Sequence, residues 1–376
     1  MGDDFQVCSS LVFKLTNESA IYDVLEEIAL AYDVFFVYFL LYAGPALVLA
    51  NLFAIFILTR KELRTPYNIF FLVMAIDQSL SILGRSVLLW KSYLNFGCGF
   101  TFTLPYQIFE IGIVNLCPMC SAHATWLAVI ITFVRLRHIK ASAEEPSTRY
   151  IVTLCSTSFA LVVLAGIPQF LSFEIYWTEL YLSCDGGDEH MLETVPYIWE
   201  SFRLYDNDCL LLRITYISSG VLYNALPCTL LMILSTALAY QLRKIRQIHA
   251  DTIMGRSSGV IAESVRSSWM IAMIVFTTLI TDVPQAIVNI LVGFMSDRFR
   301  NSVSTKLSAM IVTLVIFSAA INLTIYLCMS RRIREVTMSY LCCVCRKVKG
   351  KKSSRDNSSP IPQKTQHNIT VSVMIH

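Results

Sequence analysis

The fold of this chain is decided by one stretch, Ser318-Ala-Ala-Ile-Asn322-Leu-Thr-Ile-Tyr326-Leu-Cys-Met-Ser-Arg331-Arg332-Ile-Arg334. It closes an uncharged run, residues 307–330, which is long enough to cross a bilayer, because a spanning helix needs about 20 apolar residues. Asn322 and Tyr326 lie four residues apart and therefore share one helical face. In the basic segment that follows, apolar residues recur at roughly helical spacing at Ile333, Val336, Tyr340 and Val344. This order indicates a membrane-spanning helix followed by an amphipathic helix on the basic, cytoplasmic surface.

The composition of the whole chain agrees with a membrane protein. Hydrophobic residues make up 55% of the 376 residues, and charged residues only 15%. Uncharged or nearly uncharged runs occur at residues 34–59, 66–90, 111–134, 150–173, 214–241, 267–295 and 307–330. Each run should be an α-helix, because the backbone groups of a lipid-exposed span must be satisfied within the protein. We therefore expect an all-α membrane protein, a seven-transmembrane helix bundle with a C-terminal amphipathic helix.

The distribution of basic residues predicts the orientation. Lysines and arginines gather in alternate connections and in the tail, including Arg60, Lys61, Arg64, Arg137, Lys140, Arg149, Arg243, Lys244, Arg246, Arg331, Arg332 and Arg334. Basic loops stay on the cytoplasmic side, so we expect an extracellular N-terminus and a cytoplasmic C-terminus at the plasma membrane. The expected domains are an extracellular segment (residues 1–33), the seven-helix domain with its amphipathic helix (34–345) and a disordered cytoplasmic tail (346–376).

Three kinds of covalent modification are expected. The N-terminal segment has no cleavable signal pattern, and Asn17-Glu18-Ser19 is a glycosylation sequon on the outer side. Four cysteines are expected on the outer side: Cys8, Cys98, Cys184 and Cys209. Four cysteines allow three sets of disulfide pairings, and we favour the Cys98–Cys184 disulfide. A cytoplasmic cluster suited to S-palmitoylation follows the amphipathic segment at Cys342, Cys343 and Cys345.

The second span carries a polar stripe on an otherwise apolar helix, since Asp77, Ser81 and Arg85 follow at spacings of four. A carboxylate within a membrane costs at least about 2.5–3.5 kcal/mol on insertion scales, so Asp77 is a functional candidate that should face the bundle interior. Arg85 has two readings. It could contact a ligand, or it could snorkel outward or form a salt bridge.

Other polar residues in the first and third spans are open to two interpretations. Asn51 could tie the first span to a polar partner in the second, or simply bond to backbone. Glu110 could reach a cationic ligand or remain solvated. His123 is more often a satisfied core residue than a ligand or a pH switch. Arg135 lies at the inner end of its span, where basic residues are common.

The sixth span places Thr278, Asp282, Gln285 and Asn289 on one face, and Pro284 should kink it. Asp282 could anchor a basic ligand group through a charge-assisted hydrogen bond. It could equally pair with Arg85 or another polar residue of the bundle.

The connection at residues 174–208 holds nine acidic residues against one base, Arg203. With the acidic N-terminal segment, this would give a negative outer vestibule that steers cationic ligands. The alternative is a merely hydrophilic loop.

The order of these motifs resembles the rhodopsin family of G-protein-coupled receptors over about residues 34–345. The resemblance implies a G-protein-facing latch at Arg135 and an activation switch at Tyr326. It also implies an interior polar network, with an allosteric Na⁺ near Asp77; the network residues are Asn51, Asp77, Pro284, Asn322 and Tyr326.

Departures from the family pattern indicate a particular branch. Val134-Arg135-Leu136 lacks the usual acidic residue before the arginine, Asp282 replaces the usual Trp before Pro284, and Leu323 replaces the usual Pro after Asn322. With these features the chain is similar to the myosuppressin and FMRFamide-type peptide receptors and their nematode relatives. Glu110 stands where the family usually has an outer cysteine, and this departure bears on the Cys98–Cys184 pairing.

This resemblance implies a receptor, not an enzyme, for an amidated cationic peptide that ends in Arg-Phe-amide. The ligand-binding candidates are Arg85, Glu110, Asp282, Gln285 and Asn289. The partners implied are a heterotrimeric G protein, arrestin at the tail and the lipid membrane, but no nucleic acid. No metal-ligand cluster or nucleophile–base pair stands out in the sequence. The alternatives are an environmental chemoreceptor on the same scaffold and a transporter or channel; against the latter, the sequence shows no internal repeats.

Overall fold

The computed structural model describes residues 18–63, 65–94, 103–141, 146–182, 191–252, 258–295, 299–300, 304–329 and 333–340. Several sequence-based predictions fall outside these ranges: glycosylation at Asn17, the Cys98–Cys184 disulfide and palmitoylation at Cys342, Cys343 and Cys345. Helix α1 begins at Glu18, so the second half of the expected N-terminal segment is helical.

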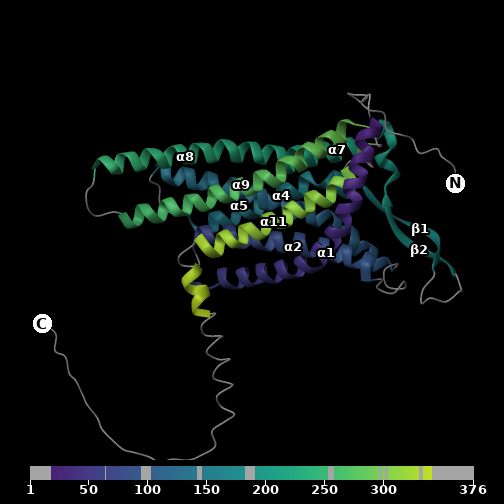
Figure 1. The fold of residues 1–376 in the computed structure, drawn as a ribbon, viewed down its shortest axis with the longest axis horizontal. Helices are drawn as coiled ribbons and strands as arrows, with labels where there is room; N and C mark the ends of the chain where they lie inside the picture. Colours follow the sequence, from purple (N-terminus) through teal and green to yellow (C-terminus); the bar gives the residue numbers. More distant parts are fainter. Residues whose placement is uncertain are drawn as a thin grey trace, which may run out of the picture. The chain divides into compact units, whose positions relative to one another are not determined.

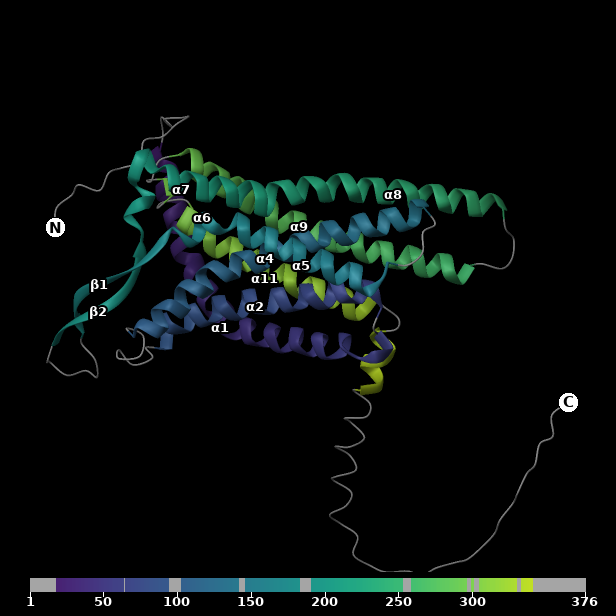
Figure 2. The ribbon, with the colours of Figure 1, turned by 180° about the vertical axis from the view of Figure 1, so that it is seen from behind.

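Within the described residues, seven helices are long and apolar enough to cross a membrane, as predicted. They run side by side in the bundle (Figures 1 and 2). The spans are α1 (Glu18–Leu58), α2 (Pro66–Leu94), α4 (Leu104–Ala141), α5 (Thr148–Ala165), the continuous α7–η3–α8, α9 (Ser258–Phe294) and α11 (Thr305–Met329). Short elements η1 (Lys61–Leu63) and α6 (Ile167–Phe170) follow α1 and α5. A further helical segment covers residues 333–340, where the amphipathic helix is expected.

The fifth span consists of α7 (Asp206–Ser218), the π-helical η3 (Ser219–Ala225) and α8 (Leu226–Thr252). The wide turn has a local cause, because Pro227 has no N–H to donate and its ring would clash with the carbonyl of Tyr223. The side chain of Tyr223 also links this turn to α5, because its hydroxyl donates to the Val162 carbonyl at 3.1 Å. The fifth span thus changes helix type here and continues as α8.

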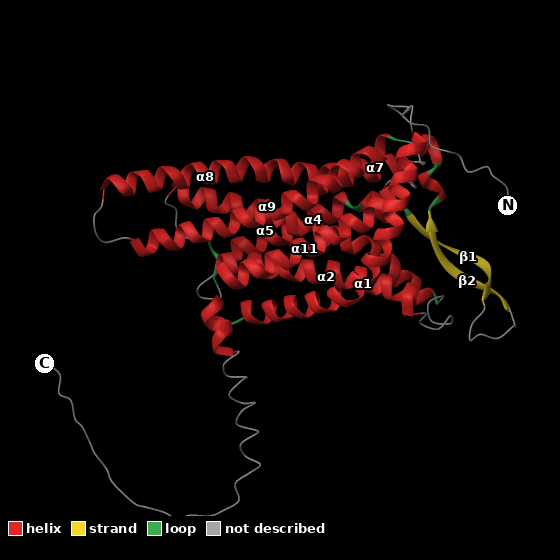
Figure 3. Ribbon diagram, viewed as in Figure 1, coloured by secondary structure: helices red, strands yellow, loops and turns green. Residues whose placement is uncertain are grey.

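The acidic connection, for which the sequence predicts a loop, contains a β-hairpin (Figure 3). Strands β1 (Phe173–Leu182) and β2 (Met191–Glu200) pair antiparallel, with Phe173 opposite Glu200 and Leu182 opposite Met191. Aromatic and β-branched residues are common in both strands, and such residues favour extended backbone. The short helix η2 (Phe202–Leu204) then leads into α7. We refer to the end of the bundle that carries β1 and β2 as the hairpin end.

Among the described residues, two of the apolar clusters join helices of the bundle. One joins Leu40, Ile82 and Ile316 of α1, α2 and α11. The other joins Met119, Val162 and Tyr223 of α4, α5 and η3. Many large apolar side chains remain exposed, as expected for helices whose outer faces meet lipid and not water.

Candidate functional site

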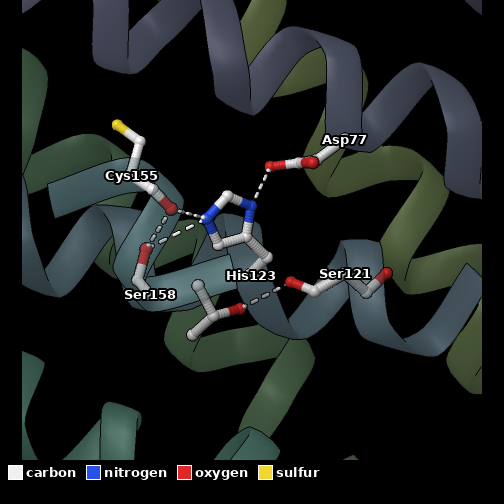
Figure 4. Close-up of polar contacts among 6 residues, drawn as sticks. Asp77, Ser121, His123, Cys155 and Ser158 are labelled. Atoms are coloured by element: carbon white, nitrogen blue, oxygen red, sulfur yellow. Dashed lines mark hydrogen bonds and ion pairs between the residues drawn. The ribbon is translucent and has the colours of Figure 1, made fainter. Parts of the chain in front are cut away.

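A buried hydrogen-bond network links Asp77 of α2 to α4 and α5 (Figure 4). The Asp77 Oδ2 atom lies 2.8 Å from Nδ1 of His123. On the other side of the ring, His123 Nε2 lies 3.1 Å from the Cys155 carbonyl oxygen and 3.0 Å from the Ser158 hydroxyl. The Ser158 hydroxyl itself donates to the Cys155 carbonyl at 2.9 Å. A carbonyl only accepts hydrogen bonds, so Nε2 carries a proton.

This arrangement fixes the net charge around Asp77. Because Nε2 is protonated, the hydrogen bond between Nδ1 and Oδ2 needs a second proton, carried by either the imidazole or the carboxyl group. In both cases the Asp77–His123 pair is neutral overall. The site therefore does not fit a Na⁺ bound at Oδ2, because the imidazole already occupies that oxygen and neutralises the carboxylate.

The rest of the α2 stripe also faces α4, as its spacing predicts. The hydroxyls of Ser81 and Ser121 lie 3.1 Å apart. One turn further, Cys117 packs so closely on Gly84 that a Cβ there would meet its sulfur at 2.4 Å. Arg85 is partly buried and its Nε has no hydrogen-bond partner. Within the described ranges Arg85 makes no ion pair.

Asp282 of α9 is 8% exposed, and both of its carboxylate oxygens accept hydrogen bonds from hydroxyl groups. Oδ2 accepts from Thr125 of α4 at 2.6 Å, and Oδ1 accepts from Thr281 at 2.9 Å. No ion pair of Asp282 occurs among the described residues. The alternative in which Asp282 pairs with Arg85 is therefore wrong for this conformation.

Thr125 is the residue that sequence reasoning missed in this contact. A threonine in an apolar helix carries no distinct signal, because its hydroxyl can bond to the carbonyl one turn back, and Thr125 also approaches the Ser121 carbonyl at 3.2 Å.

The remaining residues of the expected interior polar network differ in their hydrogen bonds. Asn322 of α11 is 2% exposed, and its Oδ1 accepts from Thr277 of α9 at 3.1 Å. Asn51 is equally buried in α1, but its Nδ2 has no hydrogen-bond partner among the described residues, so the expected tie to the second span is not formed there. Pro284 lies inside α9. Tyr326 lies in α11, with a side chain outside the described part.

Among the described residues, two adjoining cavities lie within the bundle. The core cavity, of about 50 Å³ measured to the centres of water-sized spheres, is lined by polar groups that include Asp282, Gln285 and Asn322. The hairpin cavity, of about 210 Å³ by the same measure, is lined by Glu200, Arg300 and Asn289 among others. Gln285 and Pro118 line both cavities, so the two adjoin at this level of the bundle.

The hairpin cavity contains an ion pair. Arg300, in the connection between α9 and α11, donates from Nη1 to Glu200 Oε1 at 2.8 Å and from Nη2 to the Tyr205 hydroxyl at 2.9 Å. Tyr205 in turn donates to the other oxygen of Glu200. Burial and the bond to Glu200 raise the pKa of Tyr205 to about 12, so it stays a neutral donor. Burial alone would lower the pKa of Arg300, but the charge of Glu200 outweighs it and the pKa is raised.

The other predicted site residues lie away from the cavities. Arg85 and Glu110 line neither cavity. Arg135 has its guanidinium carbon 4.9 Å from the ring centre of Tyr67 in α2, which is a cation–π contact. Of the five ligand-binding candidates, the structure thus brings together Asp282, Gln285 and Asn289. In the described residues no group of three or more His, Cys, Asp or Glu side chains could hold a metal ion.

Seven spans around a buried polar core that contains adjoining cavities are the architecture expected of a seven-helix receptor. Residues 38–344 match a family model described as serpentine type 7TM GPCR chemoreceptor Srw. The chain belongs to this family of G-protein-coupled receptors. It is therefore a multi-pass membrane receptor that signals through a G protein, and is not an enzyme. This confirms the predicted fold class and the resemblance to G-protein-coupled receptors, and it disfavours the transporter alternative.

Two curated proteins are similar to this receptor. The G-protein coupled receptor dmsr-1 of Caenorhabditis elegans is 22% identical, over 88% of this chain and 73% of its own length. The sex peptide receptor of Drosophila melanogaster is 24% identical, over 77% of this chain and 68% of its own length.

Proposed function

We propose that this receptor is activated by an amidated peptide ending in Arg-Phe-amide. The observation that carries the proposal is Asp282, a buried carboxylate on the wall of the core cavity whose hydrogen-bond partners are neutral hydroxyls. An intramembrane carboxylate that forms no ion pair is a strong candidate to bind a ligand cation. A guanidinium group suits it, because its planar donors match a carboxylate and its charge does not depend on pH.

The adjoining hairpin cavity has the chemistry for the rest of such a terminus. Gln285 and Asn289 offer amide groups that can bond to a terminal carboxamide, and Tyr216 and Leu212 offer apolar surface for a Phe ring. An amidated terminus carries no negative charge, whereas a free carboxylate would be repelled by Asp282, whose charge no ion pair among the described residues offsets. The similarity to a receptor named for a peptide, the sex peptide receptor, also supports a peptide ligand.

The orientation and the signalling partners belong to the same proposal. The hairpin end would be extracellular, with the N-terminus and Asn17 on that side, and the basic connections and tail would be cytoplasmic. Ligand binding would shift the population toward a conformation in which the G protein reaches Arg135. Arrestin would bind the tail, and Cys342, Cys343 and Cys345 would carry lipid.

The test is Asp282→Asn in transfected cells that report calcium or cAMP. Losing one charge-assisted hydrogen bond should raise the half-maximal peptide concentration about tenfold or more, at unchanged surface expression. Glu110→Gln is the matched control, since Glu110 lines neither cavity. Arg135→Ala should abolish signalling without loss of peptide binding. Peptide-evoked signalling that survives in both Asp282→Asn and Arg135→Ala would contradict the proposal.

A second candidate function is an environmental chemoreceptor, which the description of the matched family favours. Asp282 would then bind a small cation. Silence across a panel of amidated peptides, with surface expression confirmed and a response to small amines, would favour this alternative. Expression of the receptor in sensory endings would also favour the chemoreceptor function.

A further inference from the structure

The hairpin cavity holds a second carboxylate, Glu200, which is bound in a different way from Asp282. Its side chain is 36% exposed, whereas the side chain of its partner Arg300 is only 10% exposed. Both oxygens of Glu200 are bonded, one to the Arg300 guanidinium and the other to the Tyr205 hydroxyl. The carboxylate is therefore accessible from the cavity and already arranged to bind a guanidinium or ammonium group.

We infer that Glu200 is a second cation subsite of the ligand cavity and that a cationic group of the ligand displaces Arg300 from it. This inference rests on the proposed function, because it concerns a cation upstream of the Arg-Phe-amide terminus, whose own arginine binds Asp282. The two acids lie in adjoining cavities that share Gln285, so one extended peptide can reach both. The ligand class is a peptide with a lysine, an arginine or a free terminal amine upstream of that terminus.

Exchange of cations has a physical advantage over binding to an empty acidic site. Burying an isolated charge is costly, whereas a ligand cation that replaces Arg300 leaves the number of charges at Glu200 unchanged. The displaced guanidinium of Arg300, whose side chain is 10% exposed, must then turn toward solvent. Among the residues that line this cavity in the described part of the chain, the charged ones are Glu200 and Arg300. A ligand cation beside an undisturbed pair would meet the positive charge of Arg300, so displacement is the favourable route.

Displacement of Arg300 by a ligand cation predicts a result that a purely structural Glu200–Arg300 ion pair does not. Removing Glu200 should weaken binding of the cationic ligand, while removing Arg300 should strengthen it, because Arg300 competes for the same carboxylate. If the pair only held β2 to the α9–α11 connection, both changes would act in the same direction and would not depend on ligand charge.

The experiment uses a set of alanine-rich peptides ending in Arg-Phe-amide, each with one lysine or one norleucine at a given upstream position. In the wild-type receptor, the best-placed lysine should lower the half-maximal concentration about tenfold relative to norleucine. Glu200→Gln should abolish this lysine preference, and Arg300→Gln should increase it. Glu174→Gln is the control, since Glu174 also lies in the hairpin, accepts from Tyr176 and Ser201, and lines neither cavity.

Further variants keep the test decisive if Arg300→Gln does not reach the cell surface. Tyr205→Phe removes one bond to Glu200 and should also increase the lysine preference, whereas Arg300→Lys should stay near wild type. Lysine preference that persists in Glu200→Gln, or that is absent at every position in wild type, would overturn the second subsite while leaving the proposed function intact. Silence toward every peptide of the set would instead overturn the proposed function, and the subsite with it.

Discussion

At the scale of single residues, the structure separates two buried aspartates that look alike in the sequence. Asp77 is neutralised by a shared proton with His123, whose other nitrogen is held by the Cys155 carbonyl and Ser158. Asp282 is bound by hydroxyls from Thr125 and Thr281. The first arrangement is self-contained and structural, whereas the second keeps a carboxylate on a cavity wall. This difference supports the proposal that Asp282 recognises the ligand, and we propose a stabilising role for Asp77.

The Asp77–His123 pair yields a prediction about stability. His123→Ala leaves Asp77 buried without its partner, and breaking a buried pair costs about 3–5 kcal/mol. The melting temperature of the detergent-solubilised receptor should therefore fall by several degrees. The double variant Asp77→Ala/His123→Ala should recover part of this loss, because no unpaired charge remains buried. If the loss of stability in the double variant equals the sum of the losses in the two single variants, the residues are not coupled.

At the scale of elements, the contact between α2 and α4 continues to the end of the bundle away from the hairpin, where Tyr67 packs on Arg135. The residue before Arg135 is the buried Val134, so the acidic neighbour that restrains this arginine in related receptors is missing here. The cation–π contact is the restraint on the Arg135 guanidinium that the described structure shows. It ties α4 to the start of α2 in this structure.

This restraint can be tested through signalling without ligand. Tyr67→Leu removes the ring. Both residues are partly buried, and such a cation–π contact contributes about 0.5–1 kcal/mol or more, so basal activity should rise at least about twofold. Tyr67→Phe keeps the ring and should stay at the wild-type level. Both would be compared at equal surface expression in a G-protein activation assay. Equal basal activity in the leucine variant and wild type would argue against the restraint.

The helices could be predicted from the sequence, whereas contacts between distant helices and the β-hairpin could not. The seven spans and the stripe of Asp77, Ser81 and Arg85 follow from composition and helical spacing, which are local properties. The Asp282–Thr125 contact joins residues 157 positions apart, and a threonine in an apolar helix gives no sign of such a partner. The hairpin was missed because its many acidic residues indicated a loop, although its aromatic and β-branched residues favour strands.

At the scale of the whole molecule, the adjoining cavities form the first part of a path from the ligand toward the G protein. The hairpin cavity with Glu200 and Arg300 adjoins the core cavity with Asp282, and the core cavity also reaches Asn322 of α11. A ligand that bridges the two cavities would contact α9 and the connection that follows it. The ligand would shift the equilibrium between inactive and active conformations by the ratio of its affinities for the two.

The central claim is that a cationic, amidated peptide terminus is the activating ligand, and one measurement tests it most directly. Wild-type receptor in transfected cells would be challenged with an Arg-Phe-amide peptide and with the same peptide ending in a free acid. We predict a calcium or cAMP response to the amide at submicromolar concentration, and its loss for the acid, because the acid places a second negative charge near the unpaired carboxylate of Asp282. Equal responses to both peptides, or silence toward the amide in cells with confirmed surface expression, would contradict the account.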